Sequence, residues 1–216
     1  MKQTINLEKY KKYLDKTYSE IIQPALSGDI KTIFVCDDLP QNYNAIKRCS
    51  YDELQKIQSE GNKLSHQQDA CAFFLDKFDN TNHPLISSCI MPLVDILKDE
   101  TGLIDLSLSN KPMYYRQHNN IDGYMGWHTN SNFPGDRWYF VYNDKQESSF
   151  FRYVDTATGE MITKWEPQGW SLNYFELGNR QDPTWHCVYT GSNRFSFGIR
   201  RNPLVAKYKF KNIELR

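Results

Sequence analysis

The chain has no excess of charge of either sign. Its 216 residues include 26 lysines and arginines against 26 aspartates and glutamates, so the formal net charge is zero. A neutral chain has no overall field that would draw it to nucleic acid or to a membrane surface, and neither is expected as a partner. No apolar run approaches the roughly 20 residues of a transmembrane helix. Because residues 1–4 do not open an apolar signal segment, the sequence predicts a cytoplasmic protein.

The signs of a disulfide framework are also lacking. The cysteines are Cys36, Cys49, Cys71, Cys89 and Cys187. Their number is odd, and no two of them form a Cys-x-x-Cys pair. This usage predicts reduced thiols, most of them buried and inert, in a protein of a reducing compartment.

The first half of the chain, residues 1–110, has the three- and four-residue apolar spacing of amphipathic helices. The predicted helices cover residues 7–21, 51–62, 67–78 and 86–97. Pro24 is expected to close the first of them, and one short strand is predicted at 33–35. No catalytic pattern occurs in this half, so we interpret it mainly as helical support for a sheet.

From Pro112 onward the chain changes to short strands separated by turn residues. The predicted strands cover residues 113–117, 124–128, 137–142, 150–155, 171–176, 185–189, 194–200 and 207–213. Many short strands at such spacing are typical of a β-sandwich or a jelly roll. The expected fold class is therefore α+β. A double-stranded β-helix (jelly-roll) core over 111–216 is buttressed by the helices of 1–110, in a single domain of residues 1–216.

Two histidines of the second half stand in positions suited to a shared metal ion. His128 lies in the segment Gly126-Trp127-His128-Thr129-Asn130, and alternation along a strand places His128 and Asn130 on one face. His186 begins another predicted strand. A single histidine in a strand is usually a hydrogen-bonded structural residue. Two histidines on separate strands, with a third donor beside one of them, indicate a metal site.

Arg194 and Ser196 follow on a later strand, where they share a face with Gly198 and Arg200. An arginine and a serine that point into a packed interior are costly to bury unless they meet an anion. A dicarboxylate held by both arms of the guanidinium would meet this need. The strand therefore predicts an anion site.

Taken in chain order, these segments resemble the iron(II)/2-oxoglutarate-dependent dioxygenase superfamily, in particular its prolyl-4-hydroxylase-like branch. The resemblance covers about residues 112–201 and is carried by 126–130, 137–143, 148–153, 167–175, 185–188 and 194–196. It implies that His128, Asn130 and His186 are ligands of iron(II). It also implies that Arg194 and Ser196 bind the distal carboxylate of the cosubstrate 2-oxoglutarate, to which Tyr115 donates a hydroxyl group.

The chain departs from the family at Asn130, where the pattern has aspartate or glutamate. An asparagine offers a neutral amide oxygen, which can bind a metal but compensates none of its charge. Three outcomes stay open: an active variant site, a degenerate fold used for binding, or a site completed by another carboxylate such as Asp136 or Asp182.

The function that these residues predict is an iron(II)- and 2-oxoglutarate-dependent oxygenase. It would use oxygen to hydroxylate a C–H bond of a peptidyl side chain or a small molecule, with His128, His186 and Arg194 as catalytic residues. The alternative is a non-catalytic jelly-roll module that binds a partner through the same cleft.

Overall fold

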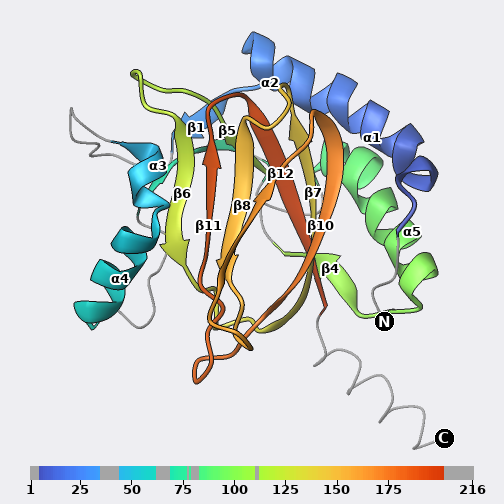
Figure 1. Ribbon diagram of the computed structural model, residues 1–216. Helices are drawn as coiled ribbons and strands as arrows, with labels where there is room; N and C mark the ends of the chain where they lie inside the picture. The colour runs from blue at the N-terminus through green and yellow to red at the C-terminus, as the bar shows by residue number, and fades with distance from the viewer. Residues whose placement is uncertain are drawn as a thin grey trace, which may run out of the picture.

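The computed structural model of the chain describes residues 5–34, 44–61, 69–76, 78, 83–109 and 112–201. It combines helices with two antiparallel β-sheets (Figure 1). Cys36 and the predicted strand at 207–213 lie outside the described residues. Within those residues, no helix is both long and apolar enough to cross a membrane.

A continuous helical run opens the described chain. It consists of η1 (Leu7–Tyr10), α1 (Lys11–Thr17), η2 (Tyr18–Ile22) and α2 (Gln23–Ser27). The prediction that Pro24 closes this helix is wrong, because the run continues to Ser27 and ends at Gly28, whose φ is +87°. The π turn of η2 precedes Pro24, so the helix is already widened where the proline, which lacks an N–H and crowds the preceding turn, must fit.

The second long helix has the same construction. The π turn η3 (Ile86–Ile90) leads into α5 (Met91–Thr101), which carries Pro92 in its first turn and ends at Gly102 with φ +69°. The predicted helix at 51–62 is confirmed as α4 (Tyr51–Ser59), and the short α3 (Ala45–Arg48) precedes it. Ser50 caps α4 by accepting a hydrogen bond from the Glu53 N–H at 3.2 Å.

The strands form one sheet of seven and one of five. The first contains β1 (Thr32–Phe34), β3 (Phe73–Leu75), β5 (Met113–Tyr115), β12 (Arg194–Arg201), β7 (Gly135–Asn143) and β10 (Gly169–Leu177) in this order, with β4 (Leu106–Leu108) against β12. The second contains β2 (Ala70–Cys71), β6 (Gly123–His128), β11 (His186–Thr190), β8 (Ser149–Val154) and β9 (Met161–Trp165) in this order.

The eight strands from β5 to β12 pair as one long antiparallel hairpin folded back on itself. Its tip is the β8–β9 pair, followed outward by β7–β10, β6–β11 and β5–β12. Pairing of β12 with β7 and of β11 with β8 then joins these ribbons into two sheets. The sequence predicted all of these strands except β9, whose residues are mostly half-buried or exposed.

The prediction of a helix over 67–78 is wrong. The described residues of this segment form β2 and β3, which lengthen the two sheets by pairing with β6 and β5. The run Ala70-Cys71-Ala72-Phe73-Phe74-Leu75 is apolar on both faces, and such a run fits a buried strand as well as a helix. The segment becomes strand because the edges of both sheets are available for pairing with it. The half 1–110 therefore also supplies four strands, β1 to β4.

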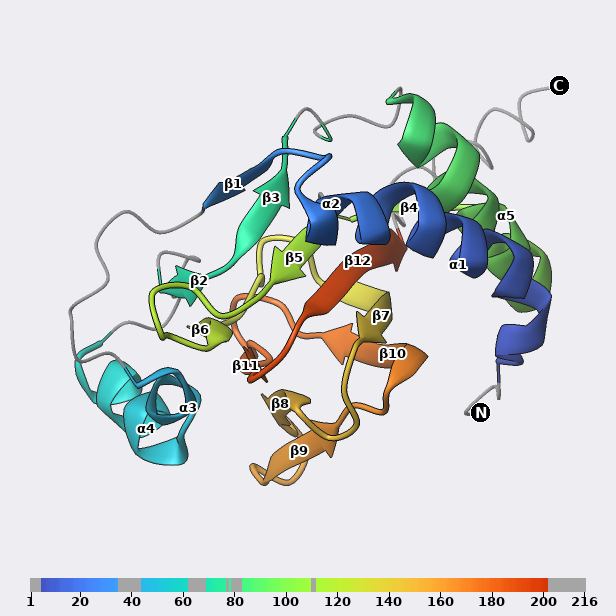
Figure 2. The ribbon, with the colours of Figure 1, turned by 90° about the horizontal axis from the view of Figure 1, so that it is seen from above.

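Three apolar clusters show how the layers pack. Phe195, Phe197 and Ile199 of β12 turn outward and pack with the residues of α1 and α5. Trp127 and Cys187 turn to the outer side of the five-stranded sheet, against α3 and α4. A third cluster contains residues of both sheets and occupies the space between them. Figure 2 shows the two sheets as facing layers, with α1, α2 and α5 outside the larger one.

Candidate functional site

A cavity of about 290 Å³ lies between the two sheets. It is lined by all six residues that the sequence singled out as ligands or anchors: Tyr115, His128, Asn130, His186, Arg194 and Ser196. Aromatic and aliphatic side chains of β8, β10 and β11, among them Phe151, Phe175 and Val188, form part of the remaining wall. The predicted site residues therefore share one cavity.

His128 and His186 form a cross-strand pair. The last residue of β6 lies directly opposite the first residue of β11, and the ring centroids are 4.1 Å apart. Both side chains are buried, with exposures of 4% and 3%. Burial lowers the pKa of His128 to about 4. Burial, together with the nearby His128 and Arg137, holds the pKa of His186 well below its usual value, so both rings are neutral at pH 7.

A backbone carbonyl orients each imidazole. His128 Nδ1 lies 2.8 Å from the Gly126 oxygen, and His186 Nδ1 lies 2.9 Å from the Thr184 oxygen. A carbonyl only accepts hydrogen bonds, so each Nδ1 carries the proton and each Nε2 keeps a lone pair. Histidines that bind metals commonly donate their other ring nitrogen to a carbonyl in this way.

A β-bulge sets the direction of His128. His186 pairs with His128 and Val188 pairs with Met125, so β6 has one more residue than β11 across this interval. The extra residue puts Met125 and His128 on the same face, and both line the cavity. Gly126 sits in the bulge, where a Cβ atom would lie 2.6 Å from Asp69 Oδ2. Simple alternation could not predict this arrangement.

Asn130 reaches the cavity from beyond the end of β6. Its φ is +50°, a left-handed conformation that asparagine tolerates better than most residues, and its carbonyl accepts a hydrogen bond from the Phe133 N–H at 3.0 Å. Its amide nitrogen lies 3.2 Å from His186 Nε2. Asn130 and His128 both line the cavity, but a left-handed turn rather than strand alternation places Asn130 there.

No carboxylate completes the two-histidine group among the described residues. The cavity lining contains neither aspartate nor glutamate, and no cluster of three metal-binding acidic, histidine or cysteine side chains occurs in this part of the chain. Asp136 accepts a hydrogen bond from the Tyr174 hydroxyl at 2.6 Å, and Asp182 lines a separate surface pocket. The donor set toward the cavity is therefore two imidazoles and an amide.

The anion that Arg194 meets is supplied by the chain itself. Arg194 Nε and Nη2 donate to the two carboxylate oxygens of Glu166 at 2.7 and 2.8 Å. The exposures of the two side chains are 3% and 1%. Burial opposes the charged form of Arg194, but the attraction and hydrogen bonds of Glu166 outweigh it and raise its pKa. Arg194 Nη1 donates to the Ser196 hydroxyl at 3.1 Å.

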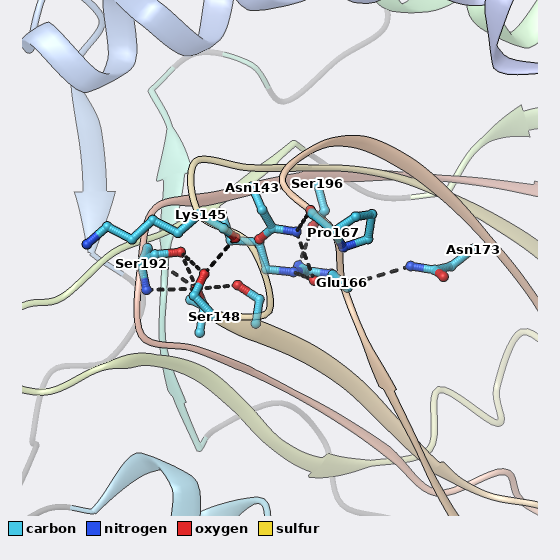
Figure 3. A network of polar contacts seen from close by, with 11 residues as sticks. Asn143, Lys145, Ser148, Glu166, Pro167, Asn173, Ser192 and Ser196 are labelled. Carbon is cyan, nitrogen blue, oxygen red and sulfur yellow. Dashed lines mark hydrogen bonds and ion pairs between the residues drawn. The ribbon is translucent and has the colours of Figure 1, made fainter.

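Glu166 has further donors around it. Asn143 Nδ2 lies 3.3 Å from its Oε2, and Asn173 Nδ2 lies 3.4 Å from its Oε1 (Figure 3). Tyr115 lies on the other side of the arginine, with its ring centroid 5.3 Å from the Arg194 guanidinium carbon. Burial raises the pKa of Tyr115, and its hydroxyl points to Met113 Sδ at 3.5 Å. This end of the cavity is a polar network in which Asn143 Oδ1 is buried without a hydrogen-bond partner among the described residues.

Sequence reasoning missed Glu166 and Arg137. Glu166 follows the strand β9, which was not predicted, and stands between Trp165 and Pro167. The available signal was chemical: a fully buried arginine requires a counter-ion, and the acidic residues of the same half were the candidates. Arg137 is the third residue of β7, has an exposure of only 3%, and also lines the cavity.

Comparisons with known proteins give little beyond this geometry. No protein-family model matches the chain, and no curated protein is detectably similar in sequence. Among solved structures, a prolyl-4-hydroxylase of Pseudomonas putida is 14% identical at a TM-score of 0.43, with 89% of this chain and 99% of that chain covered.

Two other solved structures show weaker likeness. A prolyl hydroxylase from Trichoplax adhaerens, solved with a peptide fragment of the hypoxia inducible factor oxygen degradation domain, is 10% identical at a TM-score of 0.42. That comparison covers 92% of this chain and 94% of that chain. A family 29 carbohydrate binding module is 10% identical at a TM-score of 0.27, with 44% of this chain and 75% of that chain covered. Likeness at these levels assigns no activity.

Proposed function

We propose that the cavity is the iron(II) site of a 2-oxoglutarate-dependent oxygenase with a jelly-roll core. The jelly roll is supported by the strand pairing: a single antiparallel ribbon from β5 to β12 is wound into two facing sheets. The helices buttress this core, and the whole forms one domain. The site lies inside the roll, where the two sheets enclose it.

The observation that supports the metal site best is the orientation of the two histidines. Each Nδ1–H is fixed on a carbonyl, each ring is neutral, and Asn130 stands beside His186 Nε2. Imidazole nitrogens and an amide oxygen are suitable ligands for iron(II), so the donor set fits the metal, although without the usual charge compensation. His128, His186 and Asn130 would hold the ion.

Arg194 would hold the cosubstrate. A guanidinium has five N–H donors, of which Glu166 and Ser196 engage three, and one N–H on each terminal nitrogen stays available. Ser196 and Tyr115 lie beside it in the cavity wall. Bound iron(II), with 2-oxoglutarate and oxygen, supplies the oxidising chemistry for hydroxylation of a C–H bond. The chain orients these groups and keeps water from them, since the site is deeply buried.

The test is succinate formation. Full-length protein, supplied with iron(II) and 2-oxoglutarate in air, is expected to form succinate, and His128→Ala should abolish it. His83→Ala is the matched control, because His83 stacks on Phe78 at 4.0 Å and does not line the cavity. Iron-loaded protein that forms no succinate above the enzyme-free level would refute the oxygenase.

The Glu166–Arg194 pair favours a second candidate, a non-catalytic module that binds a partner through the cavity. In such a module the charge of Arg194 is already balanced, and 2-oxoglutarate has no strong site. Calorimetry separates the two functions. The oxygenase predicts that wild-type protein binds 2-oxoglutarate and that Arg194→Gln binds it more than about tenfold more weakly. The module predicts no binding by wild-type protein and a gain of binding in Glu166→Gln.

A further inference from the structure

Two arginines face each other at the other end of the cavity. Arg137 of β7 and Arg200 of β12 are directly opposite each other in the strand register, and both line the cavity. Like charges in such a cross-strand position destabilise a sheet. Accordingly, burial and then the charge of Arg200 lower the pKa of Arg137. A fold that places two guanidiniums here needs compensation from elsewhere.

The described residues provide that compensation only in part, through the charge of Asp136, which acts on Arg137 without an ion pair. Arg137 donates to the backbone oxygens of Phe133, Gly135 and Asp136, so carbonyl dipoles solvate it but no carboxylate forms an ion pair with it. Arg200 Nε is buried and has no hydrogen-bond partner, and no ion pair within 4 Å involves Arg200 in this part of the chain. Its guanidinium lies 5.0 Å from the ring of Phe133.

The balance of charge in the cavity is therefore positive. Its lining contains Arg137, Arg194 and Arg200 and no acidic residue, and Glu166 offsets only Arg194. Asn130 adds no negative charge beside the histidines. A half-buried guanidinium whose Nε has no hydrogen-bond partner favours an anion that it can bind through two hydrogen bonds, and a planar carboxylate has the matching geometry.

We propose that Arg200 and Arg137 form a second anion site, which takes a carboxylate group of the substrate. Arg194 and Arg200 are six residues apart on one strand, so their Cα atoms are about 20 Å apart at the usual strand rise. This spacing makes the Arg200 site separate from the Arg194 site proposed for 2-oxoglutarate. Phe133, which is 58% exposed and also lines the cavity, marks the Arg200 end as the one open to solvent.

The substrate is then a carboxylate-bearing molecule that enters at Phe133 and binds with its acidic group at the mouth. Its hydrocarbon part would contact Phe175, which pairs with Arg137 across β10 and β7 and has its ring 5.7 Å from that of His186. The inference of an anion site depends only on the residues of the cavity. The assignment of that site to a substrate rests on the proposed oxygenase function.

Binding of hexanoate to the metal-free, full-length protein tests the anion site. Calorimetry at constant ionic strength should show binding of hexanoate but not of its neutral isostere hexanamide. Arg200→Gln should weaken hexanoate more than tenfold, and Arg200→Lys should weaken it less. Arg201→Gln is the matched control, because Arg201 is the next residue and pairs with Asp105 at 3.1 Å instead of lining the cavity.

Three results would overturn the proposal: equal binding of hexanoate and hexanamide, equal losses in the Arg200 and Arg201 variants, or a loss in Arg194→Gln with none in Arg200→Gln. Thermal unfolding guards against a folding artefact, since removing an unpaired like charge should leave the melting temperature of Arg200→Gln at or above that of the wild type. Because no iron is present, failure of succinate formation would leave this result unchanged.

Discussion

The buried pair of Glu166 and Arg194 allows a quantitative prediction of stability. Glu166→Gln keeps the shape of the side chain but leaves Arg194, whose side chain is 3% exposed, without its counter-ion. Removing one partner of a buried ion pair costs about 3–5 kcal/mol. Because glutamine still accepts one hydrogen bond, we expect a loss of about 3 kcal/mol, which corresponds to a fall in melting temperature of roughly 6–12 °C for a protein of this size.

Urea unfolding followed by circular dichroism measures this loss. Glu160→Gln serves as the control, because Glu160 is exposed at the turn before β9, and it should unfold like the wild type. The double variant Glu166→Leu/Arg194→Met removes both charges and should recover most of the stability, since an apolar pair of similar volume can replace a buried ion pair. Wild-type stability of Glu166→Gln would show that Glu166 does not balance the charge of Arg194.

Two further predictions concern the bulge and the thiols. Gly126→Ala should lower the free energy of unfolding by about 1–3 kcal/mol through overpacking, and it should weaken iron binding. The new Cβ would lie 2.6 Å from Asp69 Oδ2 and 3.1 Å from the Asp69 backbone oxygen, in the bulge that directs His128. Unchanged unfolding and an unchanged iron titration would contradict this prediction. Cys49, Cys71, Cys89 and Cys187 are buried, and burial raises the pKa of Cys89 and Cys187, so no more than one of the five thiols should react with a disulfide reagent before unfolding.

The sequence predicted most of the strands because period-two patterns and turn residues are local signals. The prediction from sequence was wrong where tertiary contacts determine the secondary structure. The apolar run around Phe73 fits a helix or a buried strand, and only the free edges of β5 and β6 select the strand. Pro24 predicts the end of a helix, but the π turn that precedes it allows the helix to continue.

The candidate site shows the same division. The resemblance carried by segments in chain order implied six site residues, and all six line the cavity. The bulge that orients His128 and the left-handed turn at Asn130 depend on the pairing register of β6 and β11. No local sequence pattern predicts this register. The partner of Arg194 could not be chosen from the sequence because Glu166 lies beyond a strand that has no clear alternation.

Iron(II) titration of Asn130→Asp tests the central claim most directly. The substitution puts a charged oxygen on the same stem beside His186 Nε2, where the amide nitrogen now lies at 3.2 Å. In a buried cavity this compensates one unit of metal charge, so anaerobic calorimetry should show iron(II) bound at least about tenfold more tightly than by the wild type. His128→Ala and His186→Ala should bind none. Equal affinity of Asn130→Asp and the wild type, or normal binding by either histidine variant, would contradict the assignment of these residues as a metal site.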